Sequence, residues 1–246
     1  QALSTLSGST REIYDYLAQE AFGRRTQATQ QFLLASAILS RFSLPLIEAV
    51  LDPPPGGHRA TLDEVERSHL FLVPLDRERR WYRYHPLFEE FLRRIGTERH
   101  ASWVRDVHRR AAEWWERNGE INEAMTHLIA AGNVQRAANL LGSHGIDMVS
   151  RGHLETIRRW LAALPEGAPQ AEPRLALVQG LVQVATGDTR QAVGSLREAS
   201  RLLRVTRDVD GETTAIRWLV NAAAWEGEIE VLTRMLPEIT EMETRL

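Results

Sequence analysis

The sequence predicts a mainly α-helical fold that carries one small β-hairpin. Apolar residues recur at helical spacing along most of the 246 residues. One run of β-branched and aromatic residues, at 71–84, is divided by a charged turn, which is typical of a hairpin. In the second half, glycines followed by polar stretches recur, as they do where one helix ends and another begins.

The first part of the chain predicts three short helical segments. Residues 3–22 have apolar side chains at roughly helical spacing, and Gly23 ends this segment, as glycine commonly does just past a helix. Residues 31–40 predict a helix with one apolar side. Ser43 can cap a further helix over 44–51, which has a proline in its first turn, where the missing N–H costs nothing.

A loop, a further helix and the hairpin follow. Residues 52–57 are an aspartate followed by three prolines and two glycines, and they predict a surface loop. Thr61 and Glu64 form a capping box, which predicts a helix from Thr61 to residue 69. The hairpin strands, 71–75 and 81–84, then lead into a helix over 87–95. Three helices followed by a two-stranded wing is the winged-helix arrangement.

The rest of the chain predicts helical hairpins that repeat, similar to tetratricopeptide repeats. Glycine followed by a polar stretch begins a recurring unit at Gly119, Gly132, Gly187 and, more weakly, Gly227. The helices share apolar positions i, i+4 and i+7: Ala124, Leu128 and Ala131; Ala192, Leu196 and Ala199; Leu232, Leu236 and Ile239. Pro165, Pro169 and Pro173 predict a break in the stack.

Composition excludes several kinds of chemistry. The chain has no cysteine, so disulfides, thiol nucleophiles and cysteine-ligated metals are excluded. It also has no lysine, which excludes Schiff-base catalysis and a Walker-type phosphate loop. The histidines form no metal-binding motif, and no serine has an evident base partner. We therefore expect no catalytic residue and no metal site, and the absence of a long apolar run predicts no membrane partner.

Nucleic acid is not the expected partner of the winged helix. The third predicted helix carries Asp63, Glu64 and Glu66 against only Arg67, and phosphates would repel that face. The net charge of −3 gives the chain no general electrostatic attraction to nucleic acid. The glycines of residues 142–145 have the spacing of an RNA-clamping loop, but no basic or β-rich context surrounds them, and a turn at a helix end is the better interpretation.

His85 is the one candidate binding residue. It lies where the wing returns to the next helix, close to a helix N-terminus, where anions are favoured. The alternative is a partly buried histidine that is hydrogen-bonded to the backbone. The sequence leaves both interpretations open.

Four stretches resemble MalT-like, ATP-dependent LuxR-type transcriptional regulators, which are STAND signalling ATPases. They are FLLASAIL at 32–39, SHLFLVPLDRERRWYRYHPLFEEFL at 68–92, VHRRAAEWWERNGEINEAMTHLIAAGNVQRAANLL at 107–141, and LETIRRWLAALPEG at 154–167. The resemblance implies an internal piece of a longer protein. Residues 1–24 would be the last helix of an ATPase's helical domain, 25–97 the winged helix, and 98–246 the first part of a helical-repeat sensor arm.

The resemblance also implies a function. The segment would relay a signal between inducer sensing and a switch controlled by ATP and ADP, and His85 would contact the ADP phosphates in the parent protein. No cofactor is expected in this segment and no enzyme activity, although the parent would be a slow ATPase. Expected partners are the parent's own ATPase and sensor domains, an inducer, and other copies on activation, with DNA bound only through a separate C-terminal domain. The expected location is cytoplasmic. The alternatives are a stand-alone repeat scaffold that binds protein, or a winged helix that binds DNA.

Overall fold

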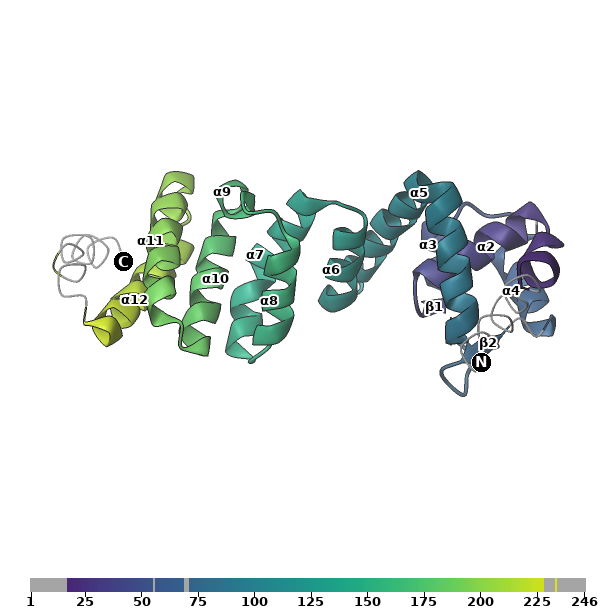
Figure 1. Ribbon diagram of the computed structural model, residues 1–246, viewed down its shortest axis with the longest axis horizontal. Coiled ribbons are helices and arrows are strands. Elements are labelled where there is room, and N and C mark those ends of the chain that lie inside the picture. Colours follow the sequence, from purple (N-terminus) through teal and green to yellow (C-terminus); the bar gives the residue numbers. More distant parts are fainter. Residues whose placement is uncertain (1–16, 55, 69–70, 228–232, 234–246) are drawn as a thin grey trace, which may run out of the picture. The chain divides into compact units, whose positions relative to one another are not determined.

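The computed structural model describes residues 17–54, 56–68, 71–227 and 233 (Figure 1). The chain divides into two compact units, Gln1–Gly132 and Asn133–Leu246. Helices make up most of both units, and the strands described belong to the first. This confirms the predicted mainly α-helical fold, in which a winged helix precedes helical repeats. No helix in the described part of the chain has the length and apolar character that a membrane span requires.

The first unit contains the helices and strands of a winged-helix domain, in which α5 is the longest helix, and the shorter helix α6 after it. In chain order these are η1 (Leu17–Gly23, a π-helix), α2 (Gln27–Ile38), β1 (Phe42–Ser43), α3 (Leu44–Val50), α4 (Gly57–Arg67), β2 (Leu72–Pro74), β3 (Trp81–Tyr84), α5 (Pro86–Arg117) and α6 (Ile121–Ala130). The predicted helices over 31–40 and 44–51 and the hairpin are confirmed. Of the first predicted segment, 3–22, residues 3–16 lie outside the described residues.

The wing is a three-stranded antiparallel sheet in the order β1-β3-β2. The sequence predicted only β2 and β3, because β1 is two residues long and gives no periodic pattern. Phe42 pairs with Tyr82, and the rings of Phe42 and Tyr84 lie 5.5 Å apart in the core. The Tyr84 hydroxyl lies 2.9 Å from the Ser36 hydroxyl of α2, so the sheet and α2 share a buried hydrogen bond.

Three predicted helix ends are corrected by the structure. The third helix begins at Gly57, not at Thr61, because Gly56 and Gly57 have positive φ and turn the chain into the helix earlier; Thr61 is buried inside it. Ser43 precedes α3 but makes no side-chain cap, since it pairs with Trp81 as part of β1. The helix predicted to end at residue 95 continues to Arg117.

Gly96 does not end helix α5 but lies inside it. The chain bends shortly afterwards. His100 has non-helical angles, φ −139° and ψ 37°. A Cβ on Gly96 would lie 3.5 Å from Cγ2 of Val104, a contact that a straight helix cannot make at a separation of eight residues. The two parts of α5 therefore meet at an angle (Figure 1). The predicted boundary between residues 97 and 98 falls within this element.

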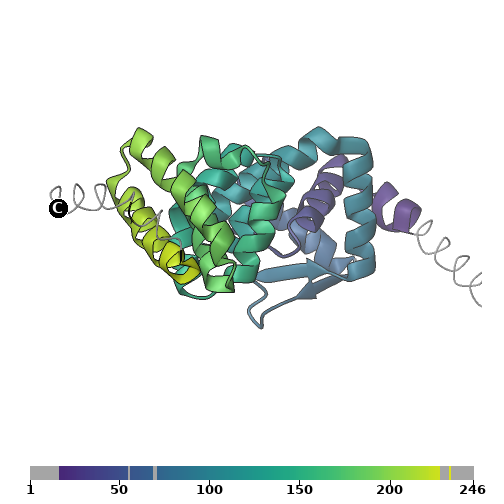
Figure 2. The ribbon, with the colours of Figure 1, turned by 60° about the vertical axis from the view of Figure 1, so that its left-hand side comes forward.

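The second unit is a series of packed helices. They are α7 (Val134–Ser150), α8 (Leu154–Ala163), α9 (Ala168–Ala171), α10 (Pro173–Thr186), α11 (Thr189–Thr206) and α12 (Val209–Glu226). Helices α10, α11 and α12 lie side by side as consecutive layers (Figures 1 and 2). Their buried core contains Ala192, Leu196 and Ala199, each 0% exposed, which confirms the predicted shared face. Leu232, Leu236 and Ile239 lie outside the described residues.

Glycines have two different roles in the repeats. Gly119, Gly132, Gly187 and Gly227 have positive φ and end helices, as the sequence predicted. Gly142 and Gly145, in contrast, lie in the middle of α7, so the predicted turn at 142–145 is wrong. A Cβ on Gly145 would lie 2.6 Å from Cγ2 of Val178, so this glycine allows α10 to approach α7 closely. Packing continues across the predicted proline break, where the short α9 precedes α10.

Candidate functional site

His85 is the N-cap residue of α5, directly after β3. Its Nδ1 accepts a hydrogen bond from the Leu87 N–H at 3.4 Å, and its carbonyl oxygen accepts from the Phe88 and Glu89 N–H groups, both at 3.0 Å. Pro86 has no N–H. Every N–H in the first turn of α5 is therefore occupied. Since Nδ1 is an acceptor, the hydrogen-bond network assigns the imidazole proton to Nε2, for which the described part of the chain supplies no partner.

The predicted position of His85 at a helix N-terminus is confirmed. The side chain is exposed rather than partly buried, and it is hydrogen-bonded to backbone, as the alternative interpretation expected. The positive end of the α5 dipole favours an anion at this place. An anion at this place would be recognised by the imidazole, because no backbone donor of the first turn remains. The contact with ADP phosphates stays a prediction.

The side of the wing next to His85 carries exposed apolar side chains. Phe71, Val73 and Leu75 are 44%, 36% and 45% exposed. Val73 pairs with Arg83, so both side chains project from the same side of the sheet, opposite to the buried Tyr82 and Tyr84. We call Phe71, Val73, Leu75 and Arg83 the outer face of the wing. Its three apolar side chains are exposed, although the Phe71 ring also packs against the ring of Phe88, with centroids 5.5 Å apart.

The free edge of the wing is a weakened place for strand pairing. The N–H of Leu75 donates to the Trp81 carbonyl, and the N–H of His85 donates to the Phe71 carbonyl, so residues 71, 73 and 75 point their backbone groups at β3. Leu72 and Pro74 therefore face the free edge, where the missing N–H of Pro74 removes one donor.

Charged groups next to His85 are linked to the core of the winged helix. Burial raises the pKa of the Glu89 carboxyl, although the positive charges of Arg93 and Arg83 oppose that shift. Arg93 pairs with Glu89 at 2.9 Å and also donates to the Ala37 carbonyl at 2.8 Å. The start of α5 is thus tied to the end of α2 through one arginine.

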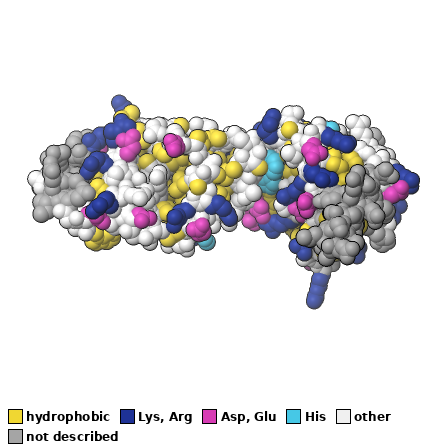
Figure 3. Space-filling view, viewed as in Figure 1, with side chains coloured by type: hydrophobic (Ala, Val, Ile, Leu, Met, Phe, Trp, Pro, Cys, Tyr) yellow, Lys and Arg dark blue, Asp and Glu magenta, His cyan; other side chains and the backbone are white. Residues whose placement is uncertain are grey.

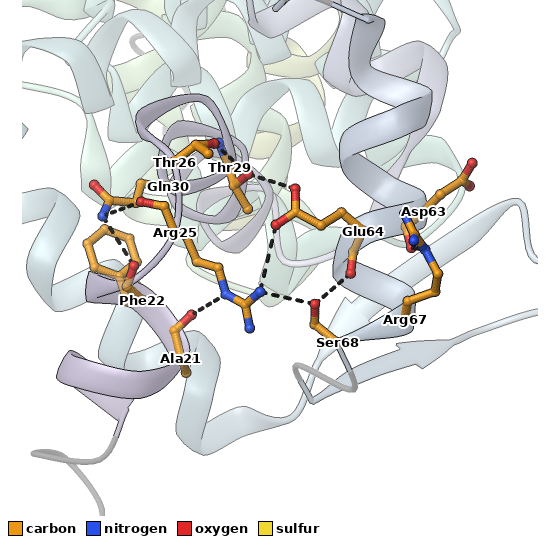
Figure 4. Close-up of polar contacts among 10 residues, drawn as sticks. All are labelled: Ala21, Phe22, Arg25, Thr26, Thr29, Gln30, Asp63, Glu64, Arg67 and Ser68. Carbon is orange, nitrogen blue, oxygen red and sulfur yellow. Dashed lines mark hydrogen bonds and ion pairs between the residues drawn. The ribbon is translucent and has the colours of Figure 1, made fainter.

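The acidic residues of α4 are held in ion pairs. Glu64 accepts from Thr29 at 3.1 Å and lies 3.7 Å from Arg25, whose guanidinium also donates to Ser68 (Figure 4). Asp63 pairs with Arg59, and Glu66 pairs with Arg79 of the wing turn. These pairs fasten α4 to the beginning of α2 and to the wing.

The pairs also affect what α4 can bind. Each carboxylate of α4 would stand opposite the phosphates if this helix entered a DNA groove, and its arginine partners are already engaged. On the face drawn in Figure 3, arginine and acidic side chains are interspersed rather than gathered by sign. Neither observation gives this helix the basic face that a duplex would attract. Among the described residues there is also no group of three or more His, Asp or Glu that could hold a metal ion.

Two side-chain clusters that involve α5 after its bend were not predicted. Arg41 contacts Trp81, Trp115 and Glu123, and His108 contacts His127. Nothing in the local sequence around Arg41 indicates its partners. His108 and His127 lie on different helices, so no single-helix spacing relates them.

The second unit contains a cavity of about 580 Å³ between α8, α9, α10 and the start of α11. Its apolar wall includes Leu164 and Val182, and its polar groups include Gln179, Gln191 and Asp188. The cavity lies where the short α9 takes the place of a full repeat helix. It is a second place at which a small molecule could bind.

The architecture defines a winged-helix domain joined to helical repeats. Residues 18–104 match the family model described as the MalT winged helix domain. Over 220 residues the chain is 32% identical to the HTH-type transcriptional regulator MalT of Cronobacter sakazakii (strain ATCC BAA-894). The alignment covers 88% of this chain and 24% of that protein, so the chain spans a minor part of its relative's length.

These comparisons confirm the predicted resemblance to MalT-like regulators. The matched family model describes a winged helix, not a catalytic domain.

Proposed function

We propose that this chain is the relay segment of an ATP-dependent transcriptional activator, which couples inducer sensing by the repeats to a nucleotide-controlled resting state. The resting state would be bound to ADP, and inducer would shift the population towards an active, self-associating state. The winged helix would hold the resting state, and the repeats would form a lever and part of the receptor.

The observation that carries this proposal is the position of His85 on α5. The imidazole presents a free Nε2–H at the N-terminus of this element, and the same element ends at Arg117, next to the first repeat helix α6. A group that binds at His85 therefore contacts the element that leads to the repeats. The cavity of about 580 Å³ in the second unit supports a role of the repeats in receiving a small molecule.

The proposed ligand of His85 is a phosphate oxygen of ADP, bound by the parent's ATPase domain. The Nε2–H would donate one hydrogen bond, and the helix dipole would add to the attraction of the anion. The outer face of the wing would lie against the protein surface around the nucleotide. Loss of these contacts would destabilise the resting state relative to the active one.

The test uses His85 variants in the full-length parent, with a transcription reporter measured without inducer. We expect His85→Ala to raise the basal output. His85→Asn retains an acceptor for the Leu87 N–H, as a good N-cap residue, but lacks the reach of Nε2, and we expect it to raise the output as well. His144→Ala, in an exposed part of α7, is the matched control.

Two outcomes would contradict the nucleotide contact. Unchanged basal output in both His85 variants would show that this residue does not hold the resting state. An increase with His85→Ala alone would show that the cap of α5 matters, rather than Nε2. The DNA-binding alternative is tested separately: it requires salt-sensitive duplex affinity of this chain, and we expect none in a gel shift.

A further inference from the structure

Arg41 joins four separate elements of the first unit. It lies in the turn between α2 and β1, and its guanidinium carbon is 5.3 Å from the ring centroid of Trp81 on β3 and 5.0 Å from that of Trp115 on α5. Its Nη2 lies 2.9 Å from Oε1 of Glu123, in the first turn of α6. An arginine in contact with two indole rings and one carboxylate combines cation–π attraction with an ion pair.

The chain leaves this cluster and returns to it. Strand β3 begins at Trp81 and leads to His85, and α5 then runs from His85 back to Trp115. The two indole rings at the ends of this stretch stack with centroids 5.6 Å apart and planes inclined by 15°. A displacement at His85 can therefore reach the Arg41 cluster along the strand and along the helix.

The same turn holds both parts of the bent helix α5. Before the bend, Arg93 donates to the Ser40 hydroxyl at 2.7 Å. After the bend, Trp115 lies against Arg41. No proline lies within α5 near His100, and Gly96 allows the close approach to Val104 without setting the angle by itself. Contacts outside the helix therefore also bear on the angle, and residues 40 and 41 provide one on each side of the bend.

The contacts of Trp115 are well suited to release. Its ring is 2% exposed, yet its Nε1–H is buried without a hydrogen-bond partner in the described part of the chain. Stacking and the guanidinium, which are less directional than a hydrogen bond, hold the ring in place. The Arg41 side chain is 42% exposed, so another group can reach it and compete for it.

We propose that Arg41 is a latch that fixes the bend of α5, and that its withdrawal from Trp81, Trp115 and Glu123 frees α6 to move relative to the winged-helix core. Arg41 is a positioning residue, since it acts through the two tryptophans. The claim that the latch responds to His85 rests on the proposed function. The claim that Arg41 fixes the bend of α5 is independent of it.

The experiment measures a distance across the bend in the complete 246-residue chain. The chain has no cysteine, so Ala60→Cys on α4 and Ala130→Cys on α6, both exposed, give two unique sites for spin labels. Double electron–electron resonance then reports the distance distribution between the winged-helix core and α6. We expect one narrow distribution with Arg41 present, and a broader or two-peaked one after Arg41→Ala.

Arg109→Ala is the matched control. Arg109 is an exposed arginine of α5 that pairs with Asp106 and Glu113 and contacts no aromatic ring, so its removal should leave the distribution narrow. Glu123→Gln retains the cation–π contacts and removes the ion pair, and we expect a smaller broadening than with Arg41→Ala. If circular dichroism shows that Arg41→Ala does not fold, Glu123→Gln replaces it as the test of the latch.

The latch is overturned if the distributions of folded Arg41→Ala and Glu123→Gln both coincide with that of the parent chain. A lower melting temperature with an unchanged distance would give Arg41 a structural role only, which also overturns the proposal. Neither result bears on the nucleotide contact of His85, which the reporter assay tests independently.

Discussion

The Nδ1 atoms of His108 and His127 lie 2.7 Å apart, one on α5 after its bend and the other on α6. One imidazole donates and the other accepts, so the accepting ring has to be neutral, and a second proton on it would break the contact. Burial lowers the pKa of His108 to about 4, with a further contribution from the charge of Arg93. Burial also lowers the pKa of His127 to about 3, and the charges of His108 and Arg93 add to it.

This pair predicts a loss of stability in acid. Both folded-state pKa values lie below the ordinary value of 6.5, so protonation favours the unfolded state. The stabilisation is present above pH 6.5 and is lost as the pH falls towards 4 and then 3. Urea unfolding at several pH values should show a smaller acid-induced loss in the free energy of unfolding for His127→Gln than for the unmodified chain. His144→Gln, at an exposed site, is the control and should retain the pH dependence of the unmodified chain. If the free energy of unfolding depends equally on pH in all three proteins, the acid sensitivity does not come from the His108–His127 pair.

Gly145→Ala should destabilise the second unit. The added Cβ would lie 2.6 Å from Cγ2 of Val178, and overpacking of this kind costs about 1–3 kcal/mol in the free energy of unfolding. Gly194→Ala in α11 is the opposite case, since nothing lies within 4 Å of its Cβ position, and we expect a gain of about 0.5–1 kcal/mol from helix propensity. Chemical denaturation compares the two. Adding Val178→Ala to Gly145→Ala should recover part of the lost free energy of unfolding. If it does not, the destabilisation does not come from the contact with Val178.

Asp208 should contribute through two separable interactions. It caps α12 by accepting from the Gly211 N–H at 3.1 Å, and it binds Arg174 of α10 through both carboxylate oxygens at 2.6 and 2.9 Å. Arg174 lowers the pKa of the Asp208 carboxyl. Asp208→Asn keeps an acceptor for the cap, whereas Asp208→Ala removes it at an additional cost of about 0.5–2 kcal/mol. Equal midpoints of urea unfolding for the two variants would argue against the cap.

His85 and Arg41 should act on the same step in the full-length parent. If the nucleotide contact and the latch belong to one relay, the double variant His85→Ala/Arg41→Ala should show a basal output close to that of the stronger single variant. Independent roles would instead give effects that multiply. The reporter assay without inducer distinguishes the two results, and Arg109→Ala combined with His85→Ala provides the reference for an unrelated pair.

The parts of the fold that depend on local chemistry could be predicted from the sequence. Glycines with positive φ end helices wherever a polar stretch follows, and the charged turn at 76–80 divides two strands of β-branched and aromatic residues. His85 was located for the same reason, because Pro86 at the start of an apolar periodic segment marks a helix N-terminus.

The parts that depend on distant partners could not be predicted. Gly145 looks like a turn residue until Val178 is placed against it. The capping box at Thr61 has the right composition, but the turn at Gly56 begins α4 earlier and places Thr61 in the core. Arg41 and Glu123 are separated by 82 residues, and no local pattern relates two residues so far apart in the sequence.

Pro74 has a consequence for the free edge of the wing. Leu72 and Pro74 are the two residues of β2 whose backbone faces that edge, and proline removes one of the two N–H donors there. A strand added at this edge would lose a ladder hydrogen bond at Pro74, whereas the exposed apolar side chains beside it remain available for side-chain contacts. The edge therefore disfavours backbone ladders, which would propagate from chain to chain.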